Sequence, residues 1–167
     1  MTIRYRPMSE HDIADVLLIQ RAQYEGRFIE PESVIRARLA SFPDTCWIAI
    51  DEEGACAYLV GYHSVVGEVI PLGGDFVAHE NPDCLYVHDL AVLPRTVGRG
   101  IGRNLVRLAW KTSVDAGVRH SALISVQDSN LFWQRLGYEQ KILTDKVQQT
   151  YLASYDETAC YMTRPLV

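Results

Sequence analysis

The fold of this chain is decided by two neighbouring runs of sequence, His88–Pro94 (HDLAVLP) and Gly98–Arg103 (GRGIGR). The first ends at a proline, which predicts a β-strand that stops there. The second places three glycines at alternate positions and leads into apolar residues at helical spacing. A helix start offers backbone N–H groups and the positive end of a dipole, which favour a phosphate group. Because Arg95, Arg99 and Arg103 surround the turn, the sequence predicts a phosphate-bearing cofactor there.

Two other phosphate-binding turns are excluded by the spacing of these glycines. A P-loop requires the pattern G-x-x-x-x-G-K-[ST], and no Gly-Lys-Ser or Gly-Lys-Thr sequence occurs in the chain. A dinucleotide fingerprint requires G-x-G-x-x-G, whereas this chain has G-x-G-x-G, which is a different turn.

Hydrophobic spacing and turn residues predict the elements on either side of this segment. A helix is expected after a capping-box-like start at Ser9 and Asp12, and Gly67–Asp83 is expected to be a long irregular loop of the kind that often carries function. No element is assigned to Thr144–Asp156. The order β-α-α-β-β-β-α-β-α-β-β indicates an α/β fold with a mixed sheet covered by helices. Strands are predicted at Thr2–Arg6, Thr45–Asp51, Ala55–His63, Leu85–Leu93, His120–Val126, Tyr138–Leu143 and Thr158–Leu166, and the later helices at Pro31–Leu39, Gly102–Ala116 and Ser129–Leu136.

Length and charge narrow the class of protein. A chain of 167 residues, 48% of them hydrophobic, suits one domain spanning residues 1–167. The net charge of −5 argues against nucleic acid as a partner and is compatible with a cationic substrate such as an amine. No signal-peptide pattern opens the chain, and no run approaches the ~18 apolar residues of a membrane span. A cytoplasmic protein without a membrane partner is therefore expected.

The four cysteines, Cys46, Cys56, Cys84 and Cys160, are widely spaced. None belongs to a C-x-x-C pair or has a histidine at ligand spacing, so no metal site is expected. Cys46 and Cys56 lie in apolar, strand-like runs, where a thiol behaves as a small hydrophobic side chain. Free buried thiols are therefore expected rather than disulfides.

Two motifs resemble the GNAT superfamily of acetyl-CoA-dependent N-acetyltransferases. The family's motif A is [Q/R]-x-x-G-x-[G/A] after a strand that ends in L-x-V-x-P; here Leu90–Pro94 supplies the strand end, and Gly100 and Gly102 supply the last two conserved positions. Downstream, Phe132–Tyr138 (FWQRLGY) is similar to the family's F-Y-x-x-x-G-F. The resemblance extends from Leu85 to about Gln140. It implies a single GNAT-like domain whose mixed, mostly antiparallel sheet is flanked by helices and has a splayed central strand pair.

The resemblance also implies a cofactor, acetyl-CoA, and a set of contacts for it. In the family, the strand at Leu90–Val92 hydrogen-bonds the pantetheine arm, and backbone N–H groups of Gly98–Arg103 hold the pyrophosphate. A strand N–H near Leu90 would polarise the thioester carbonyl. No metal is implied, and a homodimer stays open because dimers are frequent in this superfamily. The expected cofactor-binding residues are Leu90, Ala91, Val92, Val97, Gly98, Arg99, Gly100, Ile101, Gly102, Arg103 and Trp133.

The chain departs from the family pattern at two positions. Val97 stands where the family has Gln or Arg, which removes a side-chain phosphate contact that another arginine of the turn could supply. Trp133 stands where the family has the Tyr that protonates the leaving thiolate, and an indole is no acid near neutral pH. Tyr155 or Tyr138 is then the candidate general acid, with water as the alternative.

His88 and Asp89 are the candidates for moving the substrate's proton. Strand alternation places His88 on the same face as Leu90, and Asp89 on the other face. The pair resembles the base position of arylalkylamine and polyamine N-acetyltransferases, and an imidazole can accept the proton that an ammonium loses before it attacks. The alternatives are a hydrogen-bonded structural histidine and a carboxylate that caps or pairs with a neighbouring helix.

The sequence therefore predicts an acetyl-CoA-dependent N-acetyltransferase that acts by direct transfer to a primary amine, carried by a small molecule or a peptide. No covalent acetyl-enzyme is expected, because no cysteine is well placed for one. The alternative is an acyl-CoA-binding sensor or regulatory domain without turnover, which Val97 and Trp133 suggest. The identity of the amine and the preferred acyl chain stay open.

Overall fold

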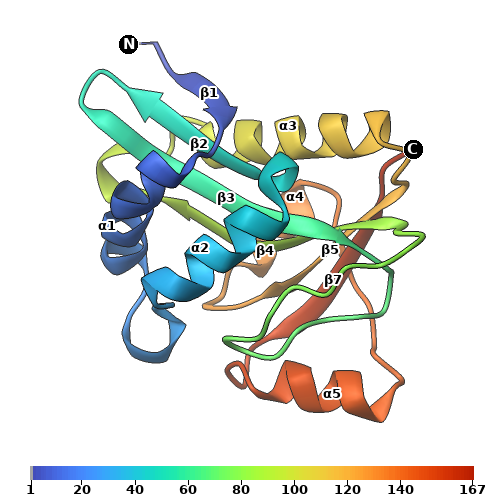
Figure 1. Ribbon diagram of the computed structural model, residues 1–167. Helices are drawn as coiled ribbons and strands as arrows, with labels where there is room; N and C mark the ends of the chain where they lie inside the picture. The colour runs from blue at the N-terminus through green and yellow to red at the C-terminus, as the bar shows by residue number, and fades with distance from the viewer. Residues whose placement is uncertain (1) are drawn as a thin grey trace. The chain divides into compact units, whose positions relative to one another are not determined.

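The computed structural model describes residues 2–167, which Figure 1 shows as a ribbon. The chain divides into two compact units. Unit 1 takes in the chain up to Gly61 together with Asp89–Lys111, and unit 2 takes in Tyr62–His88 together with Thr112–Val167. The expectation of one domain over residues 1–167 stays a prediction.

The strands of unit 1 form an antiparallel arrangement at the start of the chain. Strand β1 (Arg4–Pro7) pairs antiparallel with β2 (Cys46–Asp51), and β2 forms a hairpin with β3 (Gly54–Ser64), whose last residues pass into unit 2. The end of β4 (Cys84–Val92), from Asp89 onward, also belongs to this unit. The backbone N–H of Leu93 donates to the carbonyl of Cys56 at 2.8 Å, so the chain leaves β4 still tied to β3.

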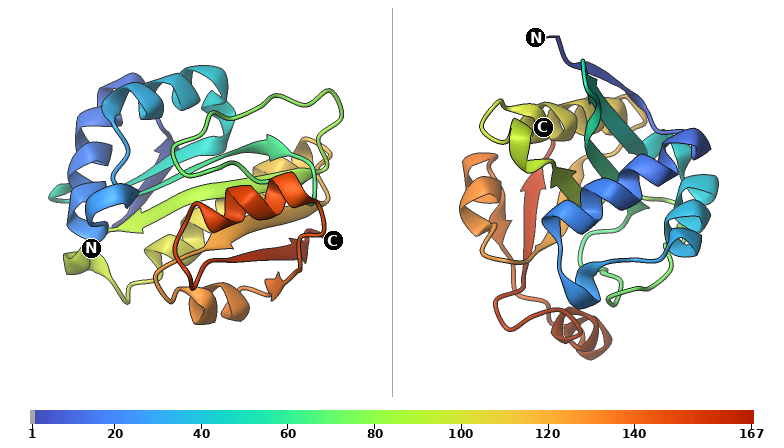
Figure 2. Two further views of the ribbon diagram at one scale, coloured as in Figure 1. Left: turned by 90° about the horizontal axis from the view of Figure 1, so that it is seen from below. Right: turned by 90° about the vertical axis from the view of Figure 1, so that its left-hand side faces the viewer.

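The helices of unit 1 lie on both faces of these strands. Helices α1 (Ile13–Gln23) and α2 (Glu32–Ser41) cover one face, and α3 (Ile101–Asp115) begins on the other, as both views of Figure 2 show. Ile13, Val16 and Ile19 of α1 are buried, as their helical spacing predicts. Short 3-10 turns occur at Glu10–Asp12, Gly26–Phe28, Pro43–Thr45 and Pro94–Thr96.

Unit 2 contains the parallel strand pair. The first half of β4 pairs with β5 (His120–Ser125) from Cys84 opposite His120 to Val87 opposite Leu123. The ladder covers only these residues, although β4 continues to Val92 and β5 to Ser125. The splaying of the central strand pair stays a prediction. Strand β5 also pairs antiparallel with β7 (Cys160–Pro165), and β7 with the short β6 (Glu139–Gln140).

The strand order of the described residues is β1-β2-β3-β4-β5-β7-β6. The pairs β1–β2, β2–β3, β5–β7 and β6–β7 are antiparallel, and β4–β5 is parallel. The predicted α/β fold, a mixed and mostly antiparallel sheet with flanking helices, is confirmed.

The start of the first helix follows its predicted capping residues. The carboxylate of Asp12 accepts hydrogen bonds from the backbone N–H of Ser9 at 2.8 Å and from its hydroxyl at 3.2 Å. Arg6 adds two charge-assisted hydrogen bonds of 2.7 Å to the same carboxylate. Asp12 therefore ties the end of β1 to the beginning of α1 through the 3-10 turn between them.

Two segments near the C-terminus differ from the prediction. The strand expected over Tyr138–Leu143 contains only Glu139–Gln140. The segment Thr144–Asp156, which received no element, forms helix α5 (Lys146–Ala153). Asp145 caps this helix, because its side chain accepts hydrogen bonds from the N–H groups of Val147 at 2.9 Å and Gln148 at 3.0 Å. Helix α4 (Asn130–Arg135) occurs where a short helix was predicted.

The irregular loop at Gly67–Asp83 is held by side chains of α5 and of the residues after it. Gln148 accepts a hydrogen bond from the N–H of Val69 at 2.7 Å, and Ser154 accepts from the N–H of Leu72 at 2.9 Å. The hydroxyl of Tyr155 donates to the carbonyl of Ile70 at 3.0 Å. The loop was predicted from the sequence, whereas helix α5, which helps to order it, was not.

No helix among the described residues combines the length and the apolar character needed to cross a bilayer. All four cysteines are free and buried, which confirms the expectation drawn from the apolar runs around Cys46 and Cys56. Burial raises the pKa of Cys46 and of Cys84 to about 12.

This burial predicts that the native protein resists thiol reagents. At pH 8, a thiol with a pKa of about 12 is ionised in roughly one molecule in ten thousand, and the thiolate is the reacting form. We expect no fast-reacting thiol with Ellman's reagent in the native protein and four after denaturation. A thiol that reacts rapidly before denaturation would contradict the burial seen here.

Candidate functional site

The glycine turn of unit 1 has the backbone geometry predicted for it. Gly98 and Gly100 have φ of 87° and 75°, in the left-handed region that favours glycine, and α3 begins at Ile101. The N–H of Asn104 donates to the carbonyl of Gly100 at 3.0 Å and closes the first turn of the helix. The N–H groups at Ile101–Arg103 precede this bond and have no acceptor within the helix, so they are placed to bind an anion.

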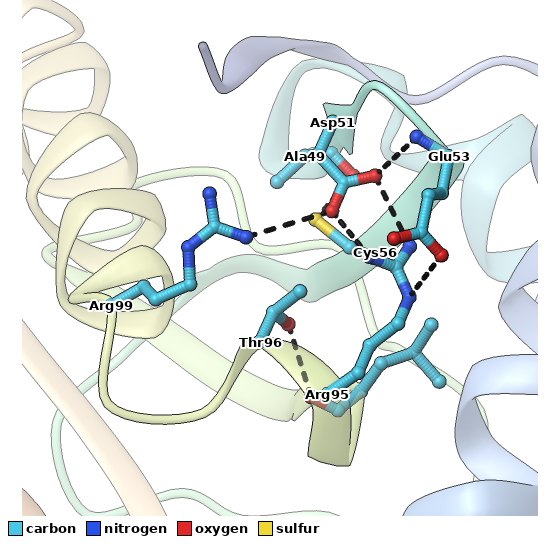
Figure 3. Close-up of polar contacts among 8 residues, drawn as sticks. Ala49, Asp51, Glu53, Cys56, Arg95, Thr96 and Arg99 are labelled. Carbon is cyan, nitrogen blue, oxygen red and sulfur yellow. Dashed lines mark hydrogen bonds and ion pairs between the residues drawn. The ribbon is translucent and has the colours of Figure 1, made fainter. Parts of the chain in front are cut away.

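The three arginines around this turn have different surroundings. Arg95 makes two hydrogen bonds to Asp51, and Nη1 of Arg99 lies 3.7 Å from the same carboxylate (Figure 3). Nη2 of Arg103 instead lies 3.3 Å from where a Cβ on Gly100 would be, directly over the turn. No ion pair among the described residues involves Arg103. Of the three arginines of the turn, Arg103 is therefore the one that does not pair with Asp51.

The open edge of β4 is contacted by the end of α1, which the sequence did not predict. In a trans peptide the C=O and the next N–H point in opposite directions, and every described peptide is trans. Because the N–H of Leu93 points to Cys56 of β3, the carbonyl of Val92 points to the opposite edge. The side-chain amide of Gln23 donates to that carbonyl, and the hydroxyl of Tyr24 lies 3.1 Å from the carbonyl oxygen of Leu90.

These contacts fall on the stretch of strand, Leu90–Val92, that the resemblance assigns to the pantetheine arm. Leu90 and Val92 are two residues apart in β4, so their carbonyl groups lie along the same edge of the strand. Gln23 and Tyr24 lie at the C-terminal end of α1, outside the motif, so the motif could not predict their contacts with β4. A ligand that pairs with this edge must displace the side chains of Gln23 and Tyr24 from those carbonyl groups.

Asp89 is held by two tyrosines within unit 1. Its carboxylate accepts hydrogen bonds from the hydroxyl of Tyr24 at 2.7 Å and from that of Tyr58. Burial, followed by the charge of Asp89, raises the pKa of both tyrosines well above its ordinary value, so both hydroxyls keep their protons. These contacts are what the structural alternative for Asp89 predicts, since Tyr24 follows α1 directly.

Replacing Asp89 by asparagine is expected to lower the free energy of unfolding by about 1–3 kcal/mol, because an amide cannot accept from both hydroxyls at full strength. Urea denaturation measures this change. Asp44→Asn is the matched control, since Asp44 is exposed and its replacement should change stability by less than about 0.5 kcal/mol. Unchanged stability with a large loss of turnover would instead show that Asp89 acts in catalysis.

His88 lies in unit 2 among aromatic side chains. It is half-buried, and its ring meets that of Phe76 edge-on with centroids 5.6 Å apart. Phe76 stacks in turn on Tyr62 at 4.2 Å, which brings the loop at Gly67–Asp83 against the strand that carries His88. Nothing in the sequence linked Phe76 to His88. The contact places the imidazole beside the irregular loop, Gly67–Asp83, that the sequence marked as one of the kind that often carries function.

The other predicted side chains of unit 2 are well anchored. The hydroxyl of Tyr155 donates to Ile70, and that of Tyr138 shares a 2.7 Å hydrogen bond with Ser121. Trp133 is 7% exposed and packs edge-on against the rings of Phe132 and Tyr138, with centroids 4.9 and 5.4 Å away. An acid role for either tyrosine stays a prediction, and it requires that the hydroxyl leave its present hydrogen bond.

The chain matches the model of one protein family, and many solved structures are similar to it in fold. The model of the acetyltransferase (GNAT) family matches residues 13–138, which is most of the chain. No curated protein matches the chain.

Three solved structures illustrate the similarity of fold. Ard1 from Thermoplasma volcanium is 15% identical over 100% of this chain and 99% of its own, with a TM-score of 0.76. Naa50 from Arabidopsis thaliana, in complex with the bisubstrate analogue CoA-Ac-MVNAL, is 13% identical over 98% and 97%, with a TM-score of 0.70. The GNAT-like decarboxylase GphF, in complex with isobutyryl-CoA, is 11% identical over 98% and 100%, with a TM-score of 0.77. At these identities the likeness shows the fold.

Proposed function

This chain belongs to the GNAT family of acetyltransferases, and we propose that it transfers the acetyl group of acetyl-CoA to a primary amine. The observation that carries the proposal is the turn at Gly98–Arg103. Two glycines with positive φ precede a helix whose first N–H groups have no acceptor within the helix. Such a turn suits the pyrophosphate of a CoA thioester.

The side chains around the turn support the same ligand. Arg103 lies over Gly100 and would add a cation to the backbone N–H groups. The open edge of β4, at Leu90 and Val92, would pair with the amide groups of the pantetheine arm once Gln23 and Tyr24 release it. The complexes of Naa50 and GphF hold CoA derivatives on the same fold, which supports a CoA-type co-substrate.

In the proposed reaction, the amine nitrogen attacks the acetyl carbonyl carbon, a C–N bond forms, and the C–S bond breaks. His88 would accept the proton that the amine loses, directly or through a water. A backbone N–H near Leu90 would stabilise the developing oxyanion. The CoA thiolate leaves and takes a proton from water or from Tyr155 or Tyr138. The buried state of all four cysteines supports direct transfer rather than an acetylated cysteine.

The acceptor is proposed to be a primary amine of a small molecule or a peptide. The bisubstrate analogue bound to Naa50 joins CoA to a peptide, which makes peptide amines worth including. The net charge of −5 is compatible with a positively charged acceptor.

A second candidate is an acyl-CoA-binding domain without acetyl transfer. Val97 and Trp133, which replace side chains common in the family, favour it. GphF is a GNAT-like decarboxylase in complex with isobutyryl-CoA, so this fold is not limited to acetyl transfer.

Calorimetric titration with acetyl-CoA, followed by a CoA-release assay over a panel of amines and peptides, tests the proposal. Micromolar one-to-one binding with release that depends on an amine would support acetyl transfer. Binding without release across the panel would support the sensor. No binding would overturn both. Because the native thiols are buried, a thiol reagent can report released CoA in this assay.

A further inference from the structure

A buried carboxylate holds the segment that leads into the glycine turn. Asp51 ends β2, and its side chain is fully buried. It accepts the backbone N–H of Glu53 at 2.9 Å within the hairpin turn. The same carboxylate accepts from both terminal nitrogens of Arg95, one of them at 3.1 Å, and lies 3.7 Å from Nη1 of Arg99. Figure 3 shows the two guanidinium groups reaching it from different sides.

The two arginines lie on either side of the start of the turn. Between them, the N–H and the hydroxyl of Thr96 donate to the carbonyl of Leu93 at 2.9 and 3.0 Å, and the N–H of Arg99 donates to the carbonyl of Thr96 at 3.4 Å. The segment is therefore ordered within itself. Beside the hydrogen bond from Leu93 to Cys56, Asp51 ties the segment to the β2–β3 hairpin at two points, at Arg95 and at Arg99.

Two carboxylates, those of Asp51 and Glu53, lie beside Arg95, and they differ in how strongly they can fix its position. Arg95 also lies 3.6 Å from Glu53, but the side chain of Glu53 is 64% exposed, whereas that of Asp51 is 0% exposed. An exposed ion pair contributes little, while a buried, bidentate one fixes geometry. Arg95 and Asp51 reinforce one another, since Arg95 lowers the pKa of Asp51 and keeps it ionised.

We propose that Asp51 is a positioning residue for the coenzyme, which holds Arg95 and Arg99 so that the N–H groups from Gly98 to Arg103 stay aimed at one point. The inference rests on the proposed function. Gly98 and Gly100 leave this backbone free to adopt many conformations unless something outside the turn fixes it. A turn that is already ordered before the ligand arrives loses less entropy on binding.

The test compares two substitutions that remove the same charge beside the same arginine. Asp51→Asn keeps the size of the side chain and removes the buried charge, and Glu53→Gln does so at the exposed position. We expect Asp51→Asn to raise the calorimetric Kd and the KM for acetyl-CoA about tenfold, with kcat at saturating acetyl-CoA within about twofold of wild type. Glu53→Gln should leave all three within about twofold.

Two further measurements keep the proposal open to refutation. Thermal unfolding shows whether Asp51→Asn is folded; if it is not, Arg95→Lys, which keeps the charge and loses the bidentate contact, should raise the KM for acetyl-CoA without lowering kcat. Equal affinity of wild type and these variants would overturn the inference alone. A wild type that does not bind acetyl-CoA would overturn the proposed function and the inference with it.

Discussion

Replacing Gly100 by glutamate is expected to weaken acetyl-CoA binding at least about 100-fold, because a carboxylate beside the pyrophosphate adds like-charge repulsion of several kcal/mol. Two other effects act in the same direction. Gly100 has φ of 75°, which a residue with a Cβ adopts at a cost, and the new Cβ would lie 3.3 Å from Nη2 of Arg103. The new carboxylate would also pair with Arg103 and occupy the cation of the turn. Calorimetric titration measures the loss.

Gly117→Glu is the matched control for this variant. Gly117 also has positive φ, at 91°, and lies beyond the other end of α3 with open space around its Cβ position. The substitution therefore repeats the backbone strain and the added charge away from the turn. We expect Gly117→Glu to bind acetyl-CoA as wild type does. If Gly100→Glu also kept wild-type affinity, Gly98–Arg103 would not be the pyrophosphate site.

Replacing His88 by alanine is expected to lower kcat by about 100-fold, the lower end of the range for a positioned general base. The affinity for acetyl-CoA should stay unchanged, because His88 precedes the β4 carbonyl groups that would bind the pantetheine arm. Steady-state kinetics with a saturating amine, together with calorimetric titration, separates the two quantities. At higher pH the difference from wild type should narrow, since a larger share of the amine is then already deprotonated.

The control for this variant is His120→Ala, which removes an exposed imidazole at the beginning of β5. It should leave kcat and affinity unchanged. Full turnover by His88→Ala at every pH would remove His88 from the mechanism and favour the alternative of a structural histidine, whose ring here also packs against Phe76. A loss of thermal stability that accounts for the lost activity would favour that alternative too.

The parts of the fold that were predictable depend on neighbours in sequence. Ser9 and Asp12 are three residues apart and predict the beginning of α1. The alternating glycines predict the beginning of α3. Helix α5 has a local signal as well, the cap at Asp145, but its residues show no clear apolar stripe and none of them is buried. A periodicity argument has nothing to detect in such a helix.

In the candidate site, too, only the parts formed by neighbouring residues could be predicted from the sequence. The turn at Gly98–Arg103 is contiguous and could be recognised from its own residues. Asp51 is 44 residues away from Arg95, and Gln23 is 69 residues away from Val92. Only the pairing of β1, β2 and β3 and the packing of α1 bring those side chains to the turn and to the edge of β4. A single sequence carries no sign of which distant side chain will arrive there.

The burial of every cysteine leaves the surface open to labelling at a chosen point. Val97 is 65% exposed and immediately precedes the glycine turn. A cysteine introduced there would be the sole thiol accessible to a maleimide dye in the folded protein, without removal of the native ones. Fluorescence from such a probe would follow the arrival of acetyl-CoA in real time, and stopped-flow mixing would resolve whether the edge of β4 is released before or after the pyrophosphate is held.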